Sequence, residues 1–292
     1  MDIVTIGSQI LIGLSRAMLL FIVASGLTIV FGVLRVINFA HGSLYMIGAF
    51  MAYTIAAASG PGPVGFWLGL ILAPAVVGLL SLAMERGLLR FIYKREHLMQ
   101  MLLTYSLVLI LGDGVKMIWG TQYKSMPVPD LFSGSFALLS ASLPKYNGFL
   151  LIVGPLVAAG LWLLLTRTRL GKICRATATD REMVDALGID STRVFAAVFV
   201  VGGWLAGLGG ALIAPTVNIS LGMDVNVIIS AFLVVVVGGL GNVWGALVSS
   251  LILGVGESLG VLIWPQMSIV MPFLITALVL ILRPSGLLKS VW

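Results

Sequence analysis

Residues 167–193 (RTRLGKICRATATDREMVDALGIDSTR) hold the largest group of charged side chains in this sequence. The segment contains six of the 17 Lys and Arg residues and four of the 11 carboxylates. No charged residue occurs in 146–166 before it or in 194–223 after it. A charged segment between two apolar runs of membrane length is typical of a loop in water, and its basic bias places it in the cytoplasm.

Seven residues of this segment have the pattern of a short capped helix: Thr179, Asp180, Arg181, Glu182, Ala186, Leu187 and Gly188. In a capping box, Thr179 would accept a hydrogen bond from the backbone three residues on, and Glu182 would reach back to the Thr179 N–H. Gly188 would end the helix at about eight residues, which is too short to span a membrane. The helix either turns the chain around or docks a small apolar face into a groove on another protein.

Two polar breaks interrupt long apolar runs, one in each half of the chain. The first break (residues 35–42) contains Asn38, Phe39, His41 and Gly42, and the second break (residues 238–245) contains Gly238, Gly239, Gly241 and Asn242. Corresponding breaks in two halves point to a binding site formed by discontinuous helices, which would line the substrate path. The alternative is two ordinary loops on the inner face, where Gly permits tight turns.

Glu257 is the only carboxylate between residues 225 and 282. An ionisable side chain inside a membrane segment is a functional candidate, so Glu257 either contacts substrate or serves as a structural hydrogen-bonding partner. Arg16 precedes an uncharged run at 17–34, and we expect it at a helix end, where its side chain reaches the interface.

The sequence contains no energy-converting or catalytic motif of its own. Gly171-Lys172 lacks the upstream glycine and the Ser/Thr of a phosphate-binding loop. No His/Glu spacing indicates a metal site, and no Ser/His/Asp set or series of buried acids indicates hydrolysis or proton relay. We therefore expect a transport subunit that is not an enzyme, binds no cofactor or metal itself, and receives energy from a partner.

Composition predicts a polytopic membrane protein. The chain has 292 residues, of which 60% are hydrophobic and only 10% charged, whereas soluble domains carry about 25% charged residues. The net charge of +6 lies in short loops, which fits the inner face of a membrane and excludes nucleic acid as a partner. The single cysteine, Cys174, excludes a disulfide framework.

Apolar runs predict an all-α fold of about eight or nine transmembrane helices. The expected spans are 10–34, 40–58, 64–84, 98–118, 146–166, 194–214, 227–237, 246–262 and 269–282. The short run 227–237 is either a crossing or a re-entrant piece. Residues 1–292 would form one permease domain, with an external loop at 119–147 and the cytoplasmic loop at 167–193.

Basic residues orient this arrangement with the N-terminus outside and the C-terminus in the cytoplasm. Arg35, four residues of 85–97, six of 167–193, Arg283 and Lys289 make up 13 of the 17 Lys and Arg residues, and all lie in predicted inner segments. The first apolar run is long enough to remain as an anchor, so we expect no cleavable signal.

Three sequence blocks, in order, resemble one family. They are GLTIVFGVLRVINFAHG (26–42), RATATDRE with the following ALG (175–182 and 186–188), and GGLGN with the following GA (238–242 and 245–246). These blocks are similar to those of ABC-type branched-chain amino acid permeases of the LivH-like class. One departure is Arg16, where a small or apolar residue would be expected.

The resemblance implies an inner-membrane permease subunit that imports leucine, isoleucine or valine. It implies a second related permease, two cytoplasmic ATPases that use ATP and contact residues 179–188, and an external solute-binding protein. Relatives of this class move urea, short amides or other amino acids, so these substrates remain alternatives. A passive channel and a secondary transporter are the other classes, the latter with only Glu257 and Asp113 as coupling residues.

Overall fold

The computed structural model describes residues 3–60, 62–93, 95–138 and 141–288. These residues form eleven α-helices: α1 (Ile3–Leu34), α2 (Ala40–Ala58), α3 (Pro63–Gly87), α4 (His97–Trp119), α5 (Lys145–Arg167), α6 (Arg169–Thr179), α7 (Arg181–Ala186), α8 (Ser191–Ile213), α9 (Met223–Gly238), α10 (Val243–Ile263) and α11 (Met267–Leu282). The fold is that of a polytopic helical membrane protein, as composition predicts.

Six of the helices are long and apolar enough to cross a membrane, namely α1, α3, α4, α5, α8 and α10. The α2 helix has 19 residues and coincides with the predicted span 40–58. The short run 227–237 lies in the 16-residue helix α9, and α11 is equally short. One difference from the all-α prediction is a small antiparallel hairpin of β1 (Ser135–Leu138) and β2 (Ala141–Pro144) within the predicted external loop.

Interior glycines allow the central helices to pack closely. The α8 helix lies against α1, α2 and α3: a side chain at Gly202 would press on Val30 of α1, and one at Gly207 would lie 2.8 Å from Val77 of α3. The α1 and α10 helices run antiparallel, since the Ser258 hydroxyl donates to the Gln9 carbonyl whereas a side chain at Gly254 would lie 2.8 Å from the Ala17 Cα. Small residues permit such close backbone approach where lipid supplies no hydrophobic driving force.

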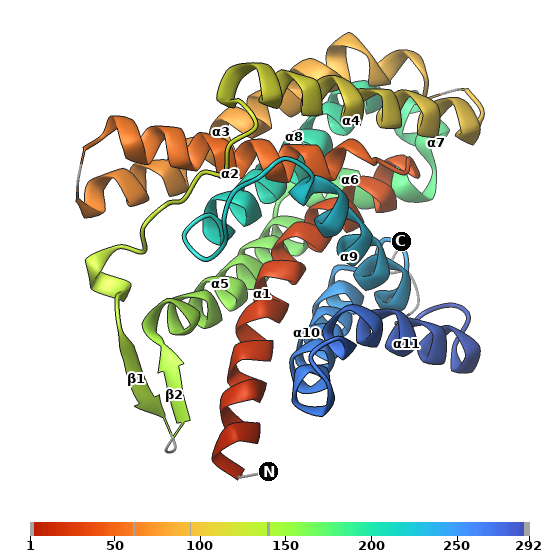
Figure 1. Ribbon diagram of the computed structural model, residues 1–292. Coiled ribbons are helices and arrows are strands. Elements are labelled where there is room, and N and C mark those ends of the chain that lie inside the picture. Colours follow the sequence, from red (N-terminus) through yellow and green to blue (C-terminus); the bar gives the residue numbers. More distant parts are fainter. Residues whose placement is uncertain (1–2, 61, 94, 139–140, 289–292) are drawn as a thin grey trace.

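The two ends of the bundle carry different elements (Figure 1). The N-terminus lies beside the hairpin, whereas the C-terminal segment lies beside α9, where Leu287 donates to the Val237 carbonyl over 2.8 Å. Arg35, His97, Ala178 and Leu240 line one cavity and thereby bring the ends of α1 and α6, the start of α4 and the α9–α10 connection together. We call this end, which also holds α7, the α6–α7 end, and the opposite one the hairpin end.

The first helix corrects the prediction for Arg16. The α1 helix continues without interruption from Ile3 to Leu34, so Arg16 lies about 20 Å from its first residue at about 1.5 Å per residue. Arg16 is therefore in the middle of the helix and not at its end. The prediction of an end position was wrong because the helix begins at Ile3, well before the uncharged run 17–34.

Candidate functional site

The first break returns the chain from the α6–α7 end into the bundle. The α1 helix ends at Leu34, but His41 at the start of α2 lies beside Val23, and the His41 Nε2 is 2.9 Å from the Val23 carbonyl oxygen. Eleven residues of helix separate Val23 from Leu34, which corresponds to about 16 Å. The α2 helix therefore begins inside the bundle, as the discontinuous-helix prediction requires for the first half.

A second helix begins at the same place from the other half of the chain. Asp224, in the first turn of α9, is buried and accepts a hydrogen bond of 3.1 Å from the Ser43 hydroxyl of α2. A side chain at Gly42 would overlap the Asp224 carbonyl oxygen, so only glycine fits there. We call this meeting of two helix N-termini, formed by residues 38–43 and Asp224, the α2–α9 junction.

Two polar atoms at the junction have no hydrogen-bond partner within the described residues. They are the Asn38 Oδ1 and the His41 Nδ1, and both side chains are buried. An unpaired buried polar atom costs about 1–3 kcal/mol. The Asp224 carboxylate offsets the positive ends of the two helix dipoles, and the Phe39 ring packs on Phe232 of α9 at 5.5 Å between centroids. The junction is thus tightly packed but incompletely satisfied.

The second break is a compact turn at the α6–α7 end. Gly238 and Gly245 are in direct backbone contact, and Gly239 has a left-handed φ of +99° that favours glycine. The Asn242 Oδ1 caps α10 by accepting from the Gly245 N–H over 3.0 Å. Here the alternative of an ordinary tight turn describes the geometry.

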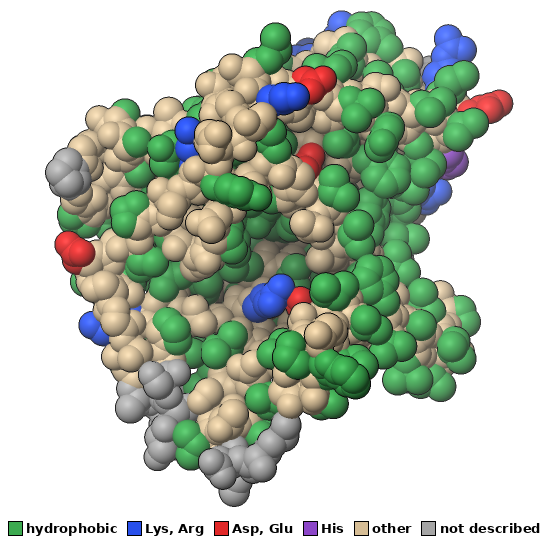
Figure 2. All heavy atoms as spheres, in the orientation of Figure 1, with side chains coloured by type: hydrophobic (Ala, Val, Ile, Leu, Met, Phe, Trp, Pro, Cys, Tyr) green, Lys and Arg blue, Asp and Glu red, His purple; other side chains and the backbone are tan. Residues whose placement is uncertain are grey.

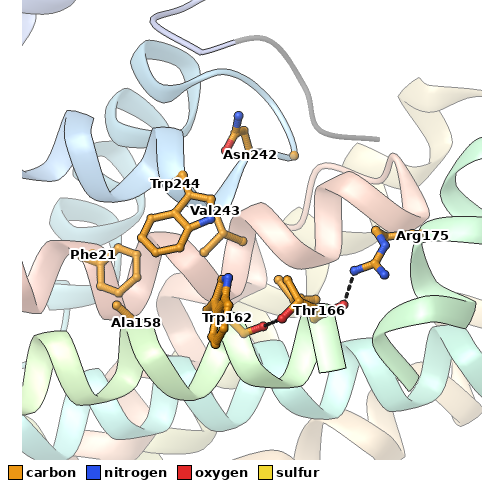
Figure 3. Close-up of a pocket in the computed structure, with 10 residues that line it drawn as sticks. Phe21, Ala158, Trp162, Thr166, Arg175, Asn242, Val243 and Trp244 are labelled. Atoms are coloured by element: carbon orange, nitrogen blue, oxygen red, sulfur yellow. Dashed lines mark hydrogen bonds between the residues drawn. The ribbon is translucent and has the colours of Figure 1, made fainter. Parts of the chain in front are cut away.

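A small apolar pocket of about 70 Å³ lies beside this turn. Figure 3 shows Trp162 of α5 and Trp244 of α10 facing each other across it, with Asn242 at its edge and Arg175 of α6 beyond Thr166. The Arg175 guanidinium donates to the Leu165 carbonyl. A second cavity, of about 580 Å³, is much larger than this pocket.

This larger cavity lies between α1, the end of α8 and α9, toward the hairpin end, and we call it the Arg16 cavity. Arg16 and Tyr45 line it together with apolar side chains and four small polar residues: Asn218, Ser220, Asn226 and Ser230. Arg16 pairs with Glu257 of α10, with 2.8 Å between Nη2 and Oε1; the arginine side chain is 55% exposed and the glutamate 14%. In Figure 2 the visible face is hollowed at its centre, where basic and acidic side chains lie together.

The charged segment 167–193 contains two helices, α6 and α7, where one was expected. The predicted capping box is wrong: Asp180 is the cap of α7, and its Oδ1 accepts from the Met183 N–H over 3.0 Å. Thr179 instead ends α6 and donates its hydroxyl to the Arg175 carbonyl. Asp180 caps the helix because α6 extends through Thr179. Only Asp180 then has the extended conformation that a cap requires.

The α7 helix has six residues rather than eight, and Gly188 follows it with a left-handed φ of +80°, as predicted. Val184 is buried, but the two larger apolar side chains of this segment point outward, with Met183 57% and Leu187 72% exposed. Glu182, Ala186 and Gly188 are exposed as well. An exposed pair of apolar side chains on a capped helix is typical of a docking surface.

Polar contacts fix α7 to the start of α8. Asp185 accepts from the Ser191 N–H over 3.0 Å and from the Ser191 hydroxyl over 3.1 Å. Arg181 donates to the Ser191 hydroxyl over 3.0 Å, and its guanidinium lies 4.8 Å from the centre of the Phe195 ring. Movement of α7 would therefore displace the N-terminus of α8.

Comparison with known proteins identifies the family. The family model described as branched-chain amino acid transport system / permease component matches residues 9–282. The chain belongs to this permease family. It is 32% identical to the high-affinity branched-chain amino acid transport system permease protein BraD of Pseudomonas aeruginosa, over 96% of this chain and 94% of that protein.

Two further relatives are named permeases of the same kind of transport system. LivH of Escherichia coli K12 is 31% identical, over 91% of this chain and 90% of that protein, and LivM of Salmonella typhimurium is 26% identical, over 94% and 68%. No solved structure was found to match the chain. The protein is thus an ABC-type permease of the LivH-like class and a multi-pass protein of the bacterial inner membrane.

In this permease the predicted path residues fall into three places. Asn38, Phe39, His41 and Gly42 lie at the α2–α9 junction, Gly238, Gly239, Gly241 and Asn242 form the turn at the α6–α7 end, and Glu257 lies behind Arg16. Sequence reasoning missed Asp224 and Ser43, and it treated Arg16 as an interfacial residue. An arginine in an apolar segment was the available signal, because a charge there requires a partner or a wet cavity.

Proposed function

We propose that the permease forms the transmembrane path of an ATP-driven importer for branched-chain amino acids. It would act with a second related permease, two cytoplasmic ATPases that hydrolyse ATP, and an external solute-binding protein. The main support is α7, which is fixed to α8 and presents exposed apolar side chains at the end that carries most of the basic residues. The relationship to LivM, also a named permease, supports a pair of different permease chains.

The proposed coupling passes from α7 through α8 into the bundle. An ATPase that holds Met183 and Leu187 would pull on Asp185 and Arg181, which contact Ser191 and Phe195 of α8. The α8 helix packs through glycines on α1, α2 and α3. Because closely packed helices move as rigid bodies, a displacement of α8 would shift the helices around the junction. ATP must bind one arrangement better than the other to drive this change.

The proposed orientation places the α6–α7 end in the cytoplasm and the N-terminus outside. Arg35, the basic residues of 85–97 and those of 167–193 then lie inside, as the positive-inside rule requires. The solute-binding protein would dock on the opposite surface, which includes residues 119–147. The hairpin β1–β2 is part of that surface.

The proposed substrate path enters through the Arg16 cavity and leaves at the α6–α7 end. A cavity of about 370 Å³, lined by Gly32, Arg35, Ile37 and Leu240, opens there. The α2–α9 junction lies between the two cavities along α1, beside Val23 and Gly26. We therefore propose the junction as the barrier that opens alternately to each side.

Uptake by proteoliposomes that contain the whole complex, with ATP inside and the solute-binding protein outside, tests this function. The importer predicts uptake of labelled leucine that requires ATP and the binding protein and persists when a protonophore collapses the proton gradient. Uptake by the permease chain alone would indicate a channel or a secondary transporter. Competition by urea, short amides and other amino acids assigns the substrate class, and purification of the native complex identifies the second permease and the ATPases.

A further inference from the structure

The Arg16 cavity combines a partly exposed guanidinium with neutral polar and aliphatic walls. An arginine in a membrane segment is expensive unless it faces protein or water. Arg16 meets this condition through Glu257 on one side and the cavity on the other. In the described part of the chain, Glu257 is its only ion-pair partner, and that contact uses a single nitrogen, Nη2.

The guanidinium therefore has unused hydrogen-bonding capacity toward the cavity. Its planar group carries five N–H donors in a fork that matches a carboxylate. Glu257 does not line the cavity and is largely buried. The glutamate thus fixes the guanidinium from behind, and the remaining donors face the space where a solute would pass.

The other walls fit the rest of an aliphatic amino acid. Leu19, Leu20 and Val23 of α1 and Val227 of α9 form apolar surface, whereas the amides and hydroxyls of Asn218, Ser220, Asn226 and Ser230 supply acceptors for an ammonium group. One cation, several neutral acceptors and an apolar wall correspond to the carboxylate, the ammonium and the branched side chain.

We propose that Arg16 binds the carboxylate of the α-amino acid in transit and that Glu257 is a positioning residue for its guanidinium. This inference rests on the proposed function and assigns the substrate class at the entrance of the path. The alternative is that the pair only joins α1 to α10, and the experiment separates the two.

The test measures solute protection of a cysteine placed in the cavity. The complete importer is reconstituted with the permease carrying Cys174→Ser and Val217→Cys, since Val217 is exposed, lines the cavity and supplies none of the proposed polar contacts. Labelling by a charged thiol reagent is followed with leucine, isocaproate, which lacks the ammonium, or isoamylamine, which lacks the carboxylate. Leucine should protect at the lowest concentration, and isoamylamine should protect least.

Arg16→Gln should raise the half-protecting leucine concentration about tenfold or more, because hydrogen bonds to a charged group are lost. Arg16→Lys keeps the charge without the fork and should be intermediate, and Glu257→Gln should have a smaller effect than Arg16→Gln. Lys116→Gln, an exposed residue outside the cavity, is the matched control and should change nothing.

Unchanged protection in Arg16→Gln, or absent protection in an active parent importer, would overturn the inference and leave the proposed function intact. The charge swap Arg16→Glu with Glu257→Arg restores an ion pair between the helices but should not restore protection by leucine. Full recovery in the swap would show a purely structural pair. A parent complex that takes up no leucine under ATP would instead refute the proposed function.

Discussion

The two breaks look alike in sequence but differ in structure. The first break brings α2 back into the bundle, where the Asn38 Oδ1 and the His41 Nδ1 lack partners among the described residues. The second break is a turn at the α6–α7 end, where Asn242 caps α10 and the Gly239 N–H bonds to the Val235 carbonyl. The first break thus leaves two buried polar side-chain atoms unpaired, whereas the second break caps the helix that follows it.

This difference separates a part suited to movement from a fixed connection. Unpaired buried polar atoms cost free energy in the observed arrangement, so a displacement that gives them partners is partly compensated. A capped turn loses its bonds when it opens. We therefore expect substitutions in the first break to affect transport most, and those in the second break to affect mainly stability.

The largest effect is expected for Gly42→Val. The new side chain would overlap the Asp224 carbonyl oxygen and lie 3.0 Å from the Ile228 Cβ, and overpacking of this kind costs about 1–3 kcal/mol. ATP-dependent leucine uptake should be abolished while the protein remains in the membrane. Gly7→Val in α1, where the added side chain meets nothing within 4 Å, is the control, and normal uptake by Gly42→Val would contradict the role of the junction.

The Ser43–Asp224 hydrogen bond should give the next largest effect. Ser43→Ala and Asp224→Ala should each lower the thermal stability of the purified complex by about 1–3 kcal/mol, because the buried partner that remains loses its hydrogen bond. The double variant should deviate from additivity by at least about 0.5 kcal/mol, since the two residues are in contact. Strict additivity in melting experiments would mean that α2 and α9 are not linked here.

Asn242→Ala in the second break should cost about 1 kcal/mol through loss of the α10 cap. Because Asn242 lies at a turn, uptake per folded molecule should stay close to that of the parent, and Asn242→Asp should restore the stability. A strong loss of uptake with unchanged melting would place Asn242 in the substrate path, as the sequence pattern predicts, and would remove the contrast between the breaks.

The smallest effect concerns Cys174 of α6, whose neighbour Arg175 lines the small pocket beside the second break. The side chain is fully buried, and burial raises the pKa of its thiol to about 11. Only the thiolate reacts, and it forms as the pH rises toward that value, so maleimide labelling near neutral pH should be slow and should increase with pH. The rate should be the same with and without ATP if this region is fixed. Acceleration by ATP would show that α6 opens during transport.

Several structural features followed directly from the sequence. The span 40–58 coincides with α2, and α3, α4, α5, α8 and α10 each begin and end within a few residues of their predicted spans, because apolar length is dictated by the bilayer. The stop at Gly188 was also predicted. The capping residue was not: both Thr179 and Asp180 suit a cap, and the choice depends on where α6 ends.

The sequence by itself determined that this chain crosses a membrane, carries no motif for an energy source and belongs with amino acid permeases, because composition and local motifs are properties of neighbouring residues. Only the tertiary structure decided how deep each break lies and which charges meet. Arg16 and Glu257 are joined by the antiparallel packing of α1 and α10, and Ser43 meets Asp224 where two helices begin inside the bundle. Such pairings depend on long-range packing, for which a single sequence contains no local pattern.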